Sequence, residues 1–92
     1  MKQETYNGWT NYATWRVNLE IFDGMSLEDL NTSNLEAYSL GEELKDYAEE
    51  ILSIDTDTSS LVYSYAMSFL SDVNWTEIAS SLIETYKDEV SA

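Results

Sequence analysis

Residues 58–71, TSSLVYSYAMSFLS, contain no charged side chain, although the chain has 18 acidic residues, four basic ones and a net charge of −14. Ser64, Ser68 and Ser71 form one narrow polar stripe on a pattern that is otherwise apolar. A helix that is apolar on nearly all sides belongs in the centre of a bundle or beneath a partner, and this one is too short to cross a bilayer. We therefore expect a helix at residues 61–70 in the centre of the fold.

The end of the chain carries the clearest amphipathic pattern. Asn74 can cap a helix, and Glu77 stands three residues on as a capping-box acid. Apolar side chains follow at helical spacing and predict one buried face: Trp75, Ile78, Ala79, Leu82, Ile83 and Tyr86. The sequence predicts a helix over residues 75–89.

A second capping box, Ser39 with Glu42, predicts a helix from residue 40 to about residue 53. One face of this helix is apolar, with Leu40, Leu44, Tyr47, Ala48, Ile51 and Leu52. The other face is acidic, with Glu42, Glu43, Asp46, Glu49 and Glu50, and only Lys45 compensates. Like charges three or four residues apart destabilise an isolated helix by about 0.2–0.5 kcal/mol per pair. This acidic face is therefore the main candidate binding surface.

The first element is ambiguous, because residues 15–21 alternate as a half-buried strand would. A helical stripe fits the same region, formed by Tyr12, Trp15, Leu19 and Phe22. A cap at Thr10 or Asn11 and a stop at Gly24 favour a helix over residues 11–23. With a short helical turn at residues 26–30, the sum is all-α: a small compact bundle of about four helices in a single acidic domain, residues 1–92.

The chain has no His and no Cys, so it lacks imidazole bases, imidazole metal ligands and thiol nucleophiles. Residues 55–59 begin like a calcium loop, but Ser60 and Ala66 stand where such a loop needs Gly and a bidentate Glu. An inter-helix turn with capping Asp and Ser side chains fits better. We expect no catalytic residue, no metal and no cofactor, so the protein is not expected to be an enzyme.

The charge also limits the partners. Phosphate contacts require clustered Lys and Arg, so a net charge of −14 argues against direct binding of nucleic acid or of an anionic membrane. An acidic helix face can instead present carboxylates to a basic groove that is built for nucleic acid. An acidic coat that only confers solubility explains the same composition, and both interpretations stay open.

The segment NGWTNYATW, residues 7–15, is the second candidate binding region. Asn7-Gly8 is a turn signal, Trp9 can pack back onto the first helical turn, and Trp15 shares the apolar stripe. In that interpretation Trp15 is a core residue and Trp9 covers the helix start. Alternatively, Trp9 and Tyr12, with Tyr6 beside them, are exposed anchors for a partner protein.

The same region carries a resemblance to a known group. The residues Tyr6-Asn7-Gly8-Trp9-Thr10-Asn11-Tyr12, Thr14-Trp15 and Val17-Asn18-Leu19 resemble the N-terminal signature of small acidic phage, prophage and plasmid proteins. Ala13 and Arg16 depart from it, since the signature usually has Glu and Asn there. The resemblance implies a mobile-element origin, and small acidic proteins of that origin look like anti-CRISPR or antirestriction factors. It transfers no functional residues.

Two main hypotheses follow, beside a third in which the protein is an enzyme that uses carboxylates alone and needs a divalent metal. In the first, the protein is a phage-type inhibitor in the host cytoplasm that acts as a DNA mimic on a host nucleic-acid-handling protein, such as a CRISPR effector or restriction enzyme. Its acidic helix face supplies the charge, and Trp9 and Tyr12 are apolar anchors. In the second, the protein is a structural or regulatory module that forms a homodimer through residues 61–70 and uses its acidic surface for solubility.

Overall fold

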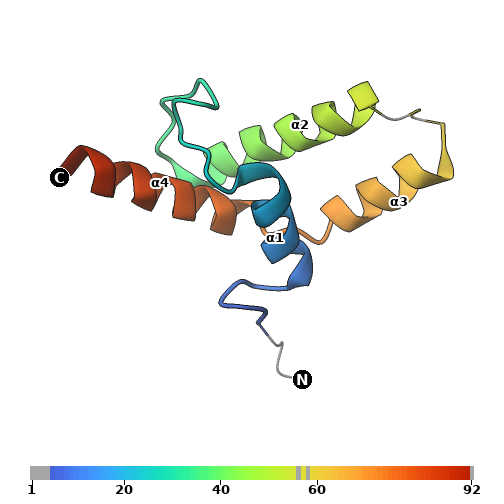
Figure 1. The fold of residues 1–92 in the computed structure, drawn as a ribbon, viewed down its shortest axis with the longest axis horizontal. Helices are drawn as coiled ribbons and strands as arrows, with labels where there is room; N and C mark the ends of the chain where they lie inside the picture. Colours follow the sequence, from blue (N-terminus) through green and yellow to red (C-terminus); the bar gives the residue numbers. More distant parts are fainter. Residues whose placement is uncertain (1–4, 56, 58, 92) are drawn as a thin grey trace.

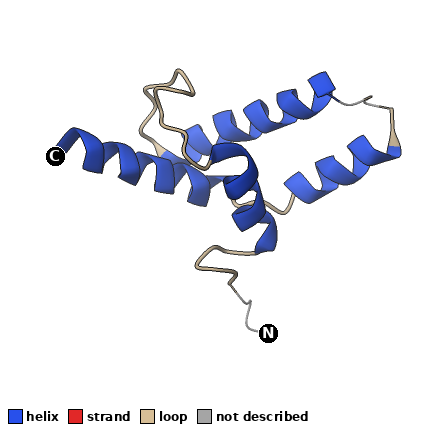
Figure 2. Cartoon of the chain, in the orientation of Figure 1, coloured by secondary structure: helices blue, strands red, loops and turns tan. Residues whose placement is uncertain are grey.

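The chain folds into helices joined by loops, and the computed structural model describes residues 5–55, 57 and 59–91. In chain order the elements are α1 (Tyr12–Val17), η1 (Asn18–Phe22), α2 (Ala37–Asp55), α3 (Leu61–Leu70) and α4 (Trp75–Ser91) (Figure 1). η1 is a π-helical segment that continues α1, so the bundle has four main helices. Helices and loops account for the described residues apart from one isolated bridge, as Figure 2 shows. The predicted all-α bundle is confirmed.

Residues 15–21 are helical, which resolves the ambiguity of the first element. The side chain of Asn11 caps α1 by accepting a hydrogen bond from the backbone N–H of Thr14 at 2.9 Å. Gly24 follows the end of η1 with φ +81°, a conformation that glycine adopts without strain. The predicted cap and stop are both confirmed.

The buried face of the first helix differs from the predicted stripe. Tyr12 and Leu19 are 43% and 44% exposed, and Trp15 is only half-buried. The positions that are buried carry mostly smaller side chains: Ala13, Thr14, Val17 and Phe22. Small residues allow α1 to lie close to the start of α4, where the Thr14 hydroxyl accepts a hydrogen bond from the Asn74 N–H at 2.9 Å. The prediction that Trp15 is a core residue is therefore wrong.

The centre of the protein lies between α2 and α4, which form the most extensive helix pair. Gly41 is buried where α2 meets the first turn of α4, and a Cβ atom there would lie 3.1 Å from the backbone of Trp75. This close approach brings the apolar faces of the two helices together. The fully covered side chains include Leu40, Leu44, Ala48, Ile78 and Ala79. Tyr47 is an exception to the predicted apolar face, because it is 37% exposed.

The start of α2 lies three residues before the predicted start. Glu36 precedes the helix, and its carboxylate accepts hydrogen bonds from the backbone N–H groups of Tyr38 and Ser39. Ser39 is therefore inside the helix and does not cap it. The capping box of Ser39 and Glu42 was a wrong prediction, because Glu36 caps the helix three residues earlier, so Ser39 already lies inside it.

The start of α4 agrees with the prediction in part. Asn74 caps it, since its side-chain oxygen accepts a hydrogen bond from the Glu77 N–H at 3.1 Å. The carboxylate of Glu77 does not return to Asn74; it accepts a hydrogen bond from the Thr10 N–H at 2.9 Å. Glu77 therefore fastens the N-terminal segment to α4, a contact between residues far apart in the chain.

The uncharged helix is not in the centre of the fold. α3 exists as predicted, and the Ser60 hydroxyl caps it by accepting a hydrogen bond from the Tyr63 N–H at 3.0 Å. Leu70 is its only buried residue, while Tyr65 is 67% exposed. Figure 1 shows α3 and the second half of α2 extending away from α1 and α4. The predicted central position was wrong, because the α2–α4 pair and the first helix already enclose the core.

The turn between α2 and α3 matches its predicted role where it is described; Thr56 and Thr58 lie outside the described residues. Asp57 accepts hydrogen bonds from the N–H and the hydroxyl of Ser59, at 2.9 and 2.8 Å. These bonds hold the pKa of Asp57 below its ordinary value. The predicted turn at residues 26–30 is also present, with Ser26 and Asp29 exchanging side-chain to backbone hydrogen bonds.

The projecting pair of helices makes the molecule extended and flat. Its dimensions are 46 × 37 × 21 Å and its radius of gyration is 14.0 Å, compared with roughly 12 Å for a compact domain of this length. None of the described helices has both the length and the apolar character needed to cross a membrane.

Candidate functional site

The predicted acidic face is present on α2, on the side opposite its buried residues. Glu42, Glu43, Asp46 and Glu50 are exposed and Glu49 is half-buried. With 3.6 residues per turn, these positions lie on the other side of the helix from Leu40, Leu44 and Ala48, which pack into the core. The structure therefore brings all five predicted carboxylates to one side of one helix.

Few cations neutralise this acidic surface. Among the side chains that the structure describes, the one ion pair joins Arg16 Nε to Glu20 Oε1 at 3.0 Å. Lys45 is on α2 itself and makes no ion pair within the described part of the chain. The acidic face of α2 therefore keeps its negative charge.

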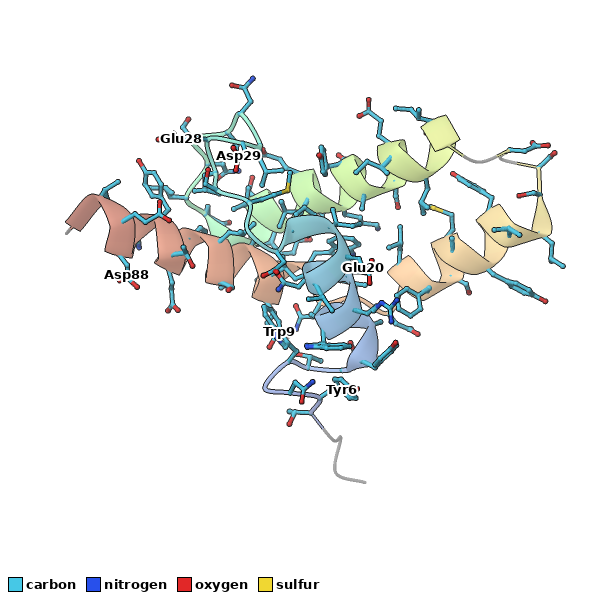
Figure 3. The ribbon with its side chains drawn as sticks, in the orientation of Figure 1. Tyr6, Trp9, Glu20, Glu28, Asp29 and Asp88 are labelled. Carbon is cyan, nitrogen blue, oxygen red and sulfur yellow. The ribbon has the colours of Figure 1, made fainter. Side chains whose placement is uncertain are left out.

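Acidic side chains also occur away from α2. Figure 3 labels Glu28 and Asp29 on the loop before α2, and Asp88 on α4. All three are exposed. Acidic residues are thus spread over several elements. α2 carries three exposed carboxylates in a row at four-residue intervals, whereas α4 has one such pair, Glu84 and Asp88.

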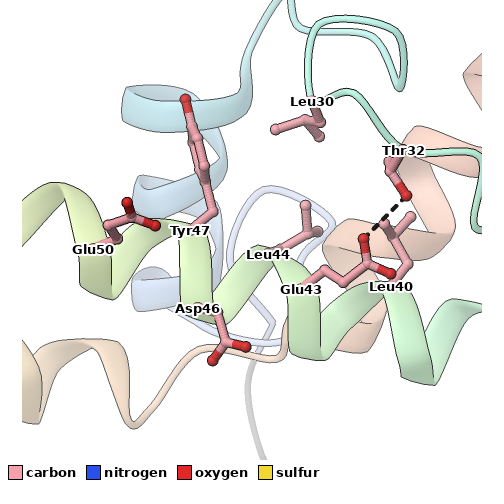
Figure 4. Close-up of a pocket in the computed structure, with 8 residues that line it drawn as sticks. All are labelled: Leu30, Thr32, Leu40, Glu43, Leu44, Asp46, Tyr47 and Glu50. Carbon is pink, nitrogen blue, oxygen red and sulfur yellow. Dashed lines mark hydrogen bonds between the residues drawn. The ribbon is translucent and has the colours of Figure 1, made fainter.

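A groove runs along one edge of the acidic face, between α2 and the loop before it (Figure 4). Its volume is about 250 Å³. Its lining combines three carboxylates with apolar side chains and two hydroxyl groups: Leu30, Thr32, Leu40, Glu43, Leu44, Asp46, Tyr47 and Glu50. Such a lining can accommodate the long apolar stem and the charged head of an Arg or Lys side chain.

Glu43 has a structural task in this groove. Its carboxylate accepts hydrogen bonds from the Thr32 hydroxyl at 3.0 Å and from the Asn34 side-chain amide at 2.6 Å. The first of these bonds is drawn in Figure 4. Glu43 therefore holds the loop against α2, while the carboxylates of Glu42, Asp46 and Glu50 have no hydrogen-bond partner in the part of the chain that the structure describes.

The predicted aromatic anchors lie elsewhere, since neither Trp9 nor Tyr12 lines this groove. Asn7 and Gly8 have φ values of 47° and 87° and form a tight turn. Tyr6 and Trp9 flank this turn and exchange two backbone hydrogen bonds of 2.8 Å. Trp9 is half-buried and packs against the core, which fits a residue that covers the helix start.

Tyr12 belongs to a cluster of partly exposed aromatic rings. Its ring centroid lies 5.1 Å from that of Tyr6, 5.7 Å from that of Trp15 and 6.4 Å from that of Phe69 on α3. Arg16 donates a hydrogen bond to the Tyr12 hydroxyl at 3.1 Å, which is the largest cause of a raised Arg16 pKa. The cluster connects the N-terminal segment to α3.

The apolar face of α3 is a surface that the predicted site residues do not include. Leu61, Val62, Tyr65 and Phe69 are 65%, 69%, 67% and 36% exposed, and we call these four residues the α3 surface. The absence of charge over residues 58–71 was the signal that could have indicated it. The pattern alone does not distinguish a buried helix from an uncovered one, so it fits both the central position and the homodimer interface predicted for residues 61–70.

The fold and these surfaces define a small acidic all-α protein with one carboxylate-rich helix face and one exposed apolar helix face. The chain belongs to a family of unknown function (DUF7249), which matches residues 2–92. No curated protein and no solved structure matches the chain.

Proposed function

We propose that this protein is a phage-type, non-enzymatic inhibitor that binds a basic, nucleic-acid-binding surface of a host defence nuclease complex. In this role it acts as a DNA mimic of the anti-CRISPR or antirestriction type. The observation that carries the proposal is the row of exposed carboxylates on α2, which has no ion-pair partner among the described side chains. Such a row is costly for an isolated helix and is useful where a cationic surface meets it.

The spacing of the row suits a surface that binds a phosphate backbone. Glu42, Asp46 and Glu50 follow one another at four-residue intervals, so each carboxylate rises about 6 Å above the last. Phosphates on one strand of duplex DNA advance by about 3.4 Å. Flexible Glu side chains can cover the remaining difference, and the partner's Arg and Lys side chains are also flexible.

The groove beside the row of carboxylates would make the binding of a partner more specific than charge attraction alone. A basic side chain that enters it would place its stem against Leu30 and Leu44. Its charged head would lie beside Glu43 or Glu50, while Asp46 points away from Leu30 (Figure 4). Charge-assisted hydrogen bonds to carboxylates are about twice as strong as neutral ones. The partner would therefore be held at a defined position, beyond simple attraction to an acidic protein.

The choice of a host nuclease among basic partners rests on the N-terminal residues that resemble the phage and plasmid group. Trp9 and Tyr12 are assigned smaller parts in this proposal than the carboxylates. Trp9 is half-buried, and Tyr12 is 43% exposed in the aromatic cluster.

The test is affinity capture of the tagged protein from a phage-susceptible host lysate, with and without excess duplex DNA. The variant Glu42→Lys/Asp46→Lys/Glu50→Lys reverses the charge of three α2 carboxylates and leaves Glu43, which holds the loop before α2, unchanged. The matched control Glu84→Lys/Asp88→Lys/Glu89→Lys changes the net charge equally, at three exposed carboxylates of α4. We expect the wild-type protein and the α4 variant to retain a nuclease complex that DNA displaces, and the α2 variant to lose it.

Two results would contradict the proposal. Equal loss of capture in both variants would mean that total charge matters and that α2 is not a specific surface. Capture that DNA does not affect would mean that the partner's nucleic-acid site is not involved. Circular dichroism of each variant checks that its helices are intact.

A second candidate function is a structural or regulatory module that self-associates through α3 and has no nucleic-acid-handling partner. The exposed α3 surface favours it. In that case the acidic α2 face confers solubility only, and the α2 and α4 variants behave alike in every binding assay.

A further inference from the structure

The α3 surface forms a continuous ridge on the outside of the molecule. Leu61, Tyr65 and Phe69 are spaced four residues apart, so they stack along one side of α3 over roughly 12 Å. Val62 widens this ridge, and all four side chains are exposed. The opposite side of α3 carries Leu70, which is buried. One face of α3 is thus attached to the protein and the other is uncovered.

The aromatic cluster extends this ridge beyond the end of α3. The Tyr12 ring meets the Phe69 ring edge-on at 6.4 Å, and the Tyr6 ring meets the Tyr12 ring edge-on at 5.1 Å. Tyr6 and Tyr12 are 39% and 43% exposed. The uncovered apolar area therefore continues from the tip of α3 to the N-terminal turn.

Charge determines what can cover this area. Two copies of a protein with a net charge of −14 repel each other over most of their surface. A twofold interface apposes the same surface of both copies, so every carboxylate in it would face another carboxylate nearby. α3 has no charged residue, and neither has any position from 58 to 71. Two copies can therefore meet through α3 without apposing acidic side chains of that helix.

The α3 surface is accessible to a second copy along its length. Its outer side chains Leu61, Val62 and Tyr65 are 65%, 69% and 67% exposed. A ridge of this kind is the apolar area that an interface between two copies would cover.

We infer that the α3 surface is a homodimer interface, in which α3 packs antiparallel against α3 of a second copy. Tyr65 is the middle residue of the ridge, so the twofold axis passes near it and Leu61 of each copy meets Phe69 of the other. Ser64 and Ser68 flank the ridge with small side chains that allow the two helices to approach. The inference gives the self-association of the second candidate function a defined packing, and it is also compatible with the inhibitor, because α2 and its acidic face stay outside the interface.

Salt separates the two proposals, because it acts on them in opposite directions. Screening weakens the repulsion between two negatively charged copies, so dimerisation strengthens as ionic strength rises. Screening also weakens the attraction of the acidic α2 face for a basic partner, so that binding becomes weaker. One proposal can therefore fail while the other holds.

The test is sedimentation of the full chain over a concentration series, at about 50 mM and about 500 mM NaCl. We expect a species of twice 10.5 kDa whose share rises with protein concentration and with salt. A protein that remains monomeric at all concentrations in both salts overturns the inference, and the α3 surface is then the site of a different partner.

The decisive variant is Tyr65→Glu, which places two carboxylates at the twofold axis. We expect it to raise the dimer dissociation constant by roughly 30-fold or more, as for a central aromatic residue. Its matched control is Tyr38→Glu at the start of α2, because Tyr38 is 66% exposed and Tyr65 is 67% exposed. Equal dimerisation of the two variants overturns the inference. Unchanged circular dichroism shows that both are folded.

A cross-linking experiment tests the position of the axis. The chain has no cysteine, so Tyr65→Cys introduces a single thiol. A residue beside a twofold axis lies next to its own copy, within the distance that a disulfide can span. Under mild air oxidation, we expect Tyr65→Cys to form a covalent dimer at least roughly tenfold faster than Tyr38→Cys. Equal rates overturn the proposed packing.

Discussion

α3 and α4 are both apolar-patterned helices that begin at a side-chain cap, yet their surroundings differ. Ile78 on α4 is 0% exposed, whereas Tyr65 on α3 is 67% exposed. α4 has a charged face and packs against α2 in the core, while α3 has no charged face and lies at the edge of the molecule. An apolar pattern therefore indicates that a helix face packs against another surface, but it does not indicate which surface that is.

Tethers to distant parts of the chain account for much of the difference. Glu77 binds the Thr10 N–H, and Thr14 binds the Asn74 N–H, so α4 is fastened to the N-terminal segment at its first turn. The hydrogen bonds of α3 within the described chain stay inside its own caps and turns. α4 is thus fixed by several segments, and α3 is free to present one face.

The largest difference between α4 and α3 should appear in the loss of stability when one apolar residue on each helix is truncated. We expect Ile78→Ala to lower the free energy of unfolding by about 2–5 kcal/mol, because it leaves a cavity in the core. Val62→Ala, at a position that is 69% exposed, should lower it by less than about 0.5 kcal/mol in dilute protein. Urea unfolding followed by circular dichroism measures both values. Similar losses would show that α3 is as well covered as α4.

A smaller effect should follow from removing a tether of α4. Thr14 is 0% exposed, and its hydroxyl also donates to the Asn11 side-chain oxygen at 2.6 Å. Thr14→Val keeps the shape but leaves the Asn74 N–H without its acceptor, at a cost of about 1–3 kcal/mol. We expect faster hydrogen exchange at the start of α4 and a lower urea midpoint.

The matched change on α3 is Ser60→Ala, which removes the hydrogen bond to the Tyr63 N–H. It should cost about 1 kcal/mol, mostly as fraying of α3. Hydrogen exchange should then rise in the first turn of α3 and stay unchanged in α4. If α4 exchanged faster as well, the two helices would be coupled more tightly than their contacts indicate.

The smallest effect concerns pH and the turn before α3. Hydrogen bonds from Ser59 lower the pKa of Asp57 in the folded protein. A carboxylate with a lowered folded pKa stabilises the turn above its unfolded pKa of about 3.9 and loses this effect as pH falls through the folded value. We therefore expect fraying at the start of α3 only in acid, below about pH 4.

Nuclear magnetic resonance can follow this change at single residues. The Asp57 carboxyl carbon should titrate below the ordinary aspartate range, and the Ser59 amide shift should follow the same curve. Asp57→Asn removes the titrating group but keeps a side-chain acceptor for Ser59. Persistence of the Ser59 transition in that variant would show that another carboxylate controls the turn.

Most elements of the fold could be predicted from local patterns. The caps Asn11, Ser60 and Asn74 mark helix starts, because a side-chain oxygen beside free N–H groups acts over three residues. The start of α2 could not be placed in this way, since Glu36 and Ser39 are both possible caps, three residues apart, and the structure uses Glu36. Which of two such caps is used depends on the path of the preceding loop.

The row of carboxylates in the candidate site could be predicted from the sequence, but its contacts with other segments could not. Four-residue spacing placed Glu42, Asp46 and Glu50 on one face of a helix, and the structure has them there. The pattern did not reveal that Glu43 is engaged with Thr32, because that contact depends on how the loop folds back. The pattern also did not predict that Trp9 packs against the core while Tyr12 remains exposed.

By itself, the sequence determined the all-α class, the main helices and the acidic face of α2, because periodicity and caps act between neighbours along the chain. Only the tertiary structure decided that Ala13 and Thr14 are buried in place of Trp15, that Gly41 brings α2 against α4, and that α3 is left uncovered. These outcomes depend on which surfaces compete for a limited core. The α2–α4 pair supplies much of that core with its buried side chains, so the most apolar helix remains outside it.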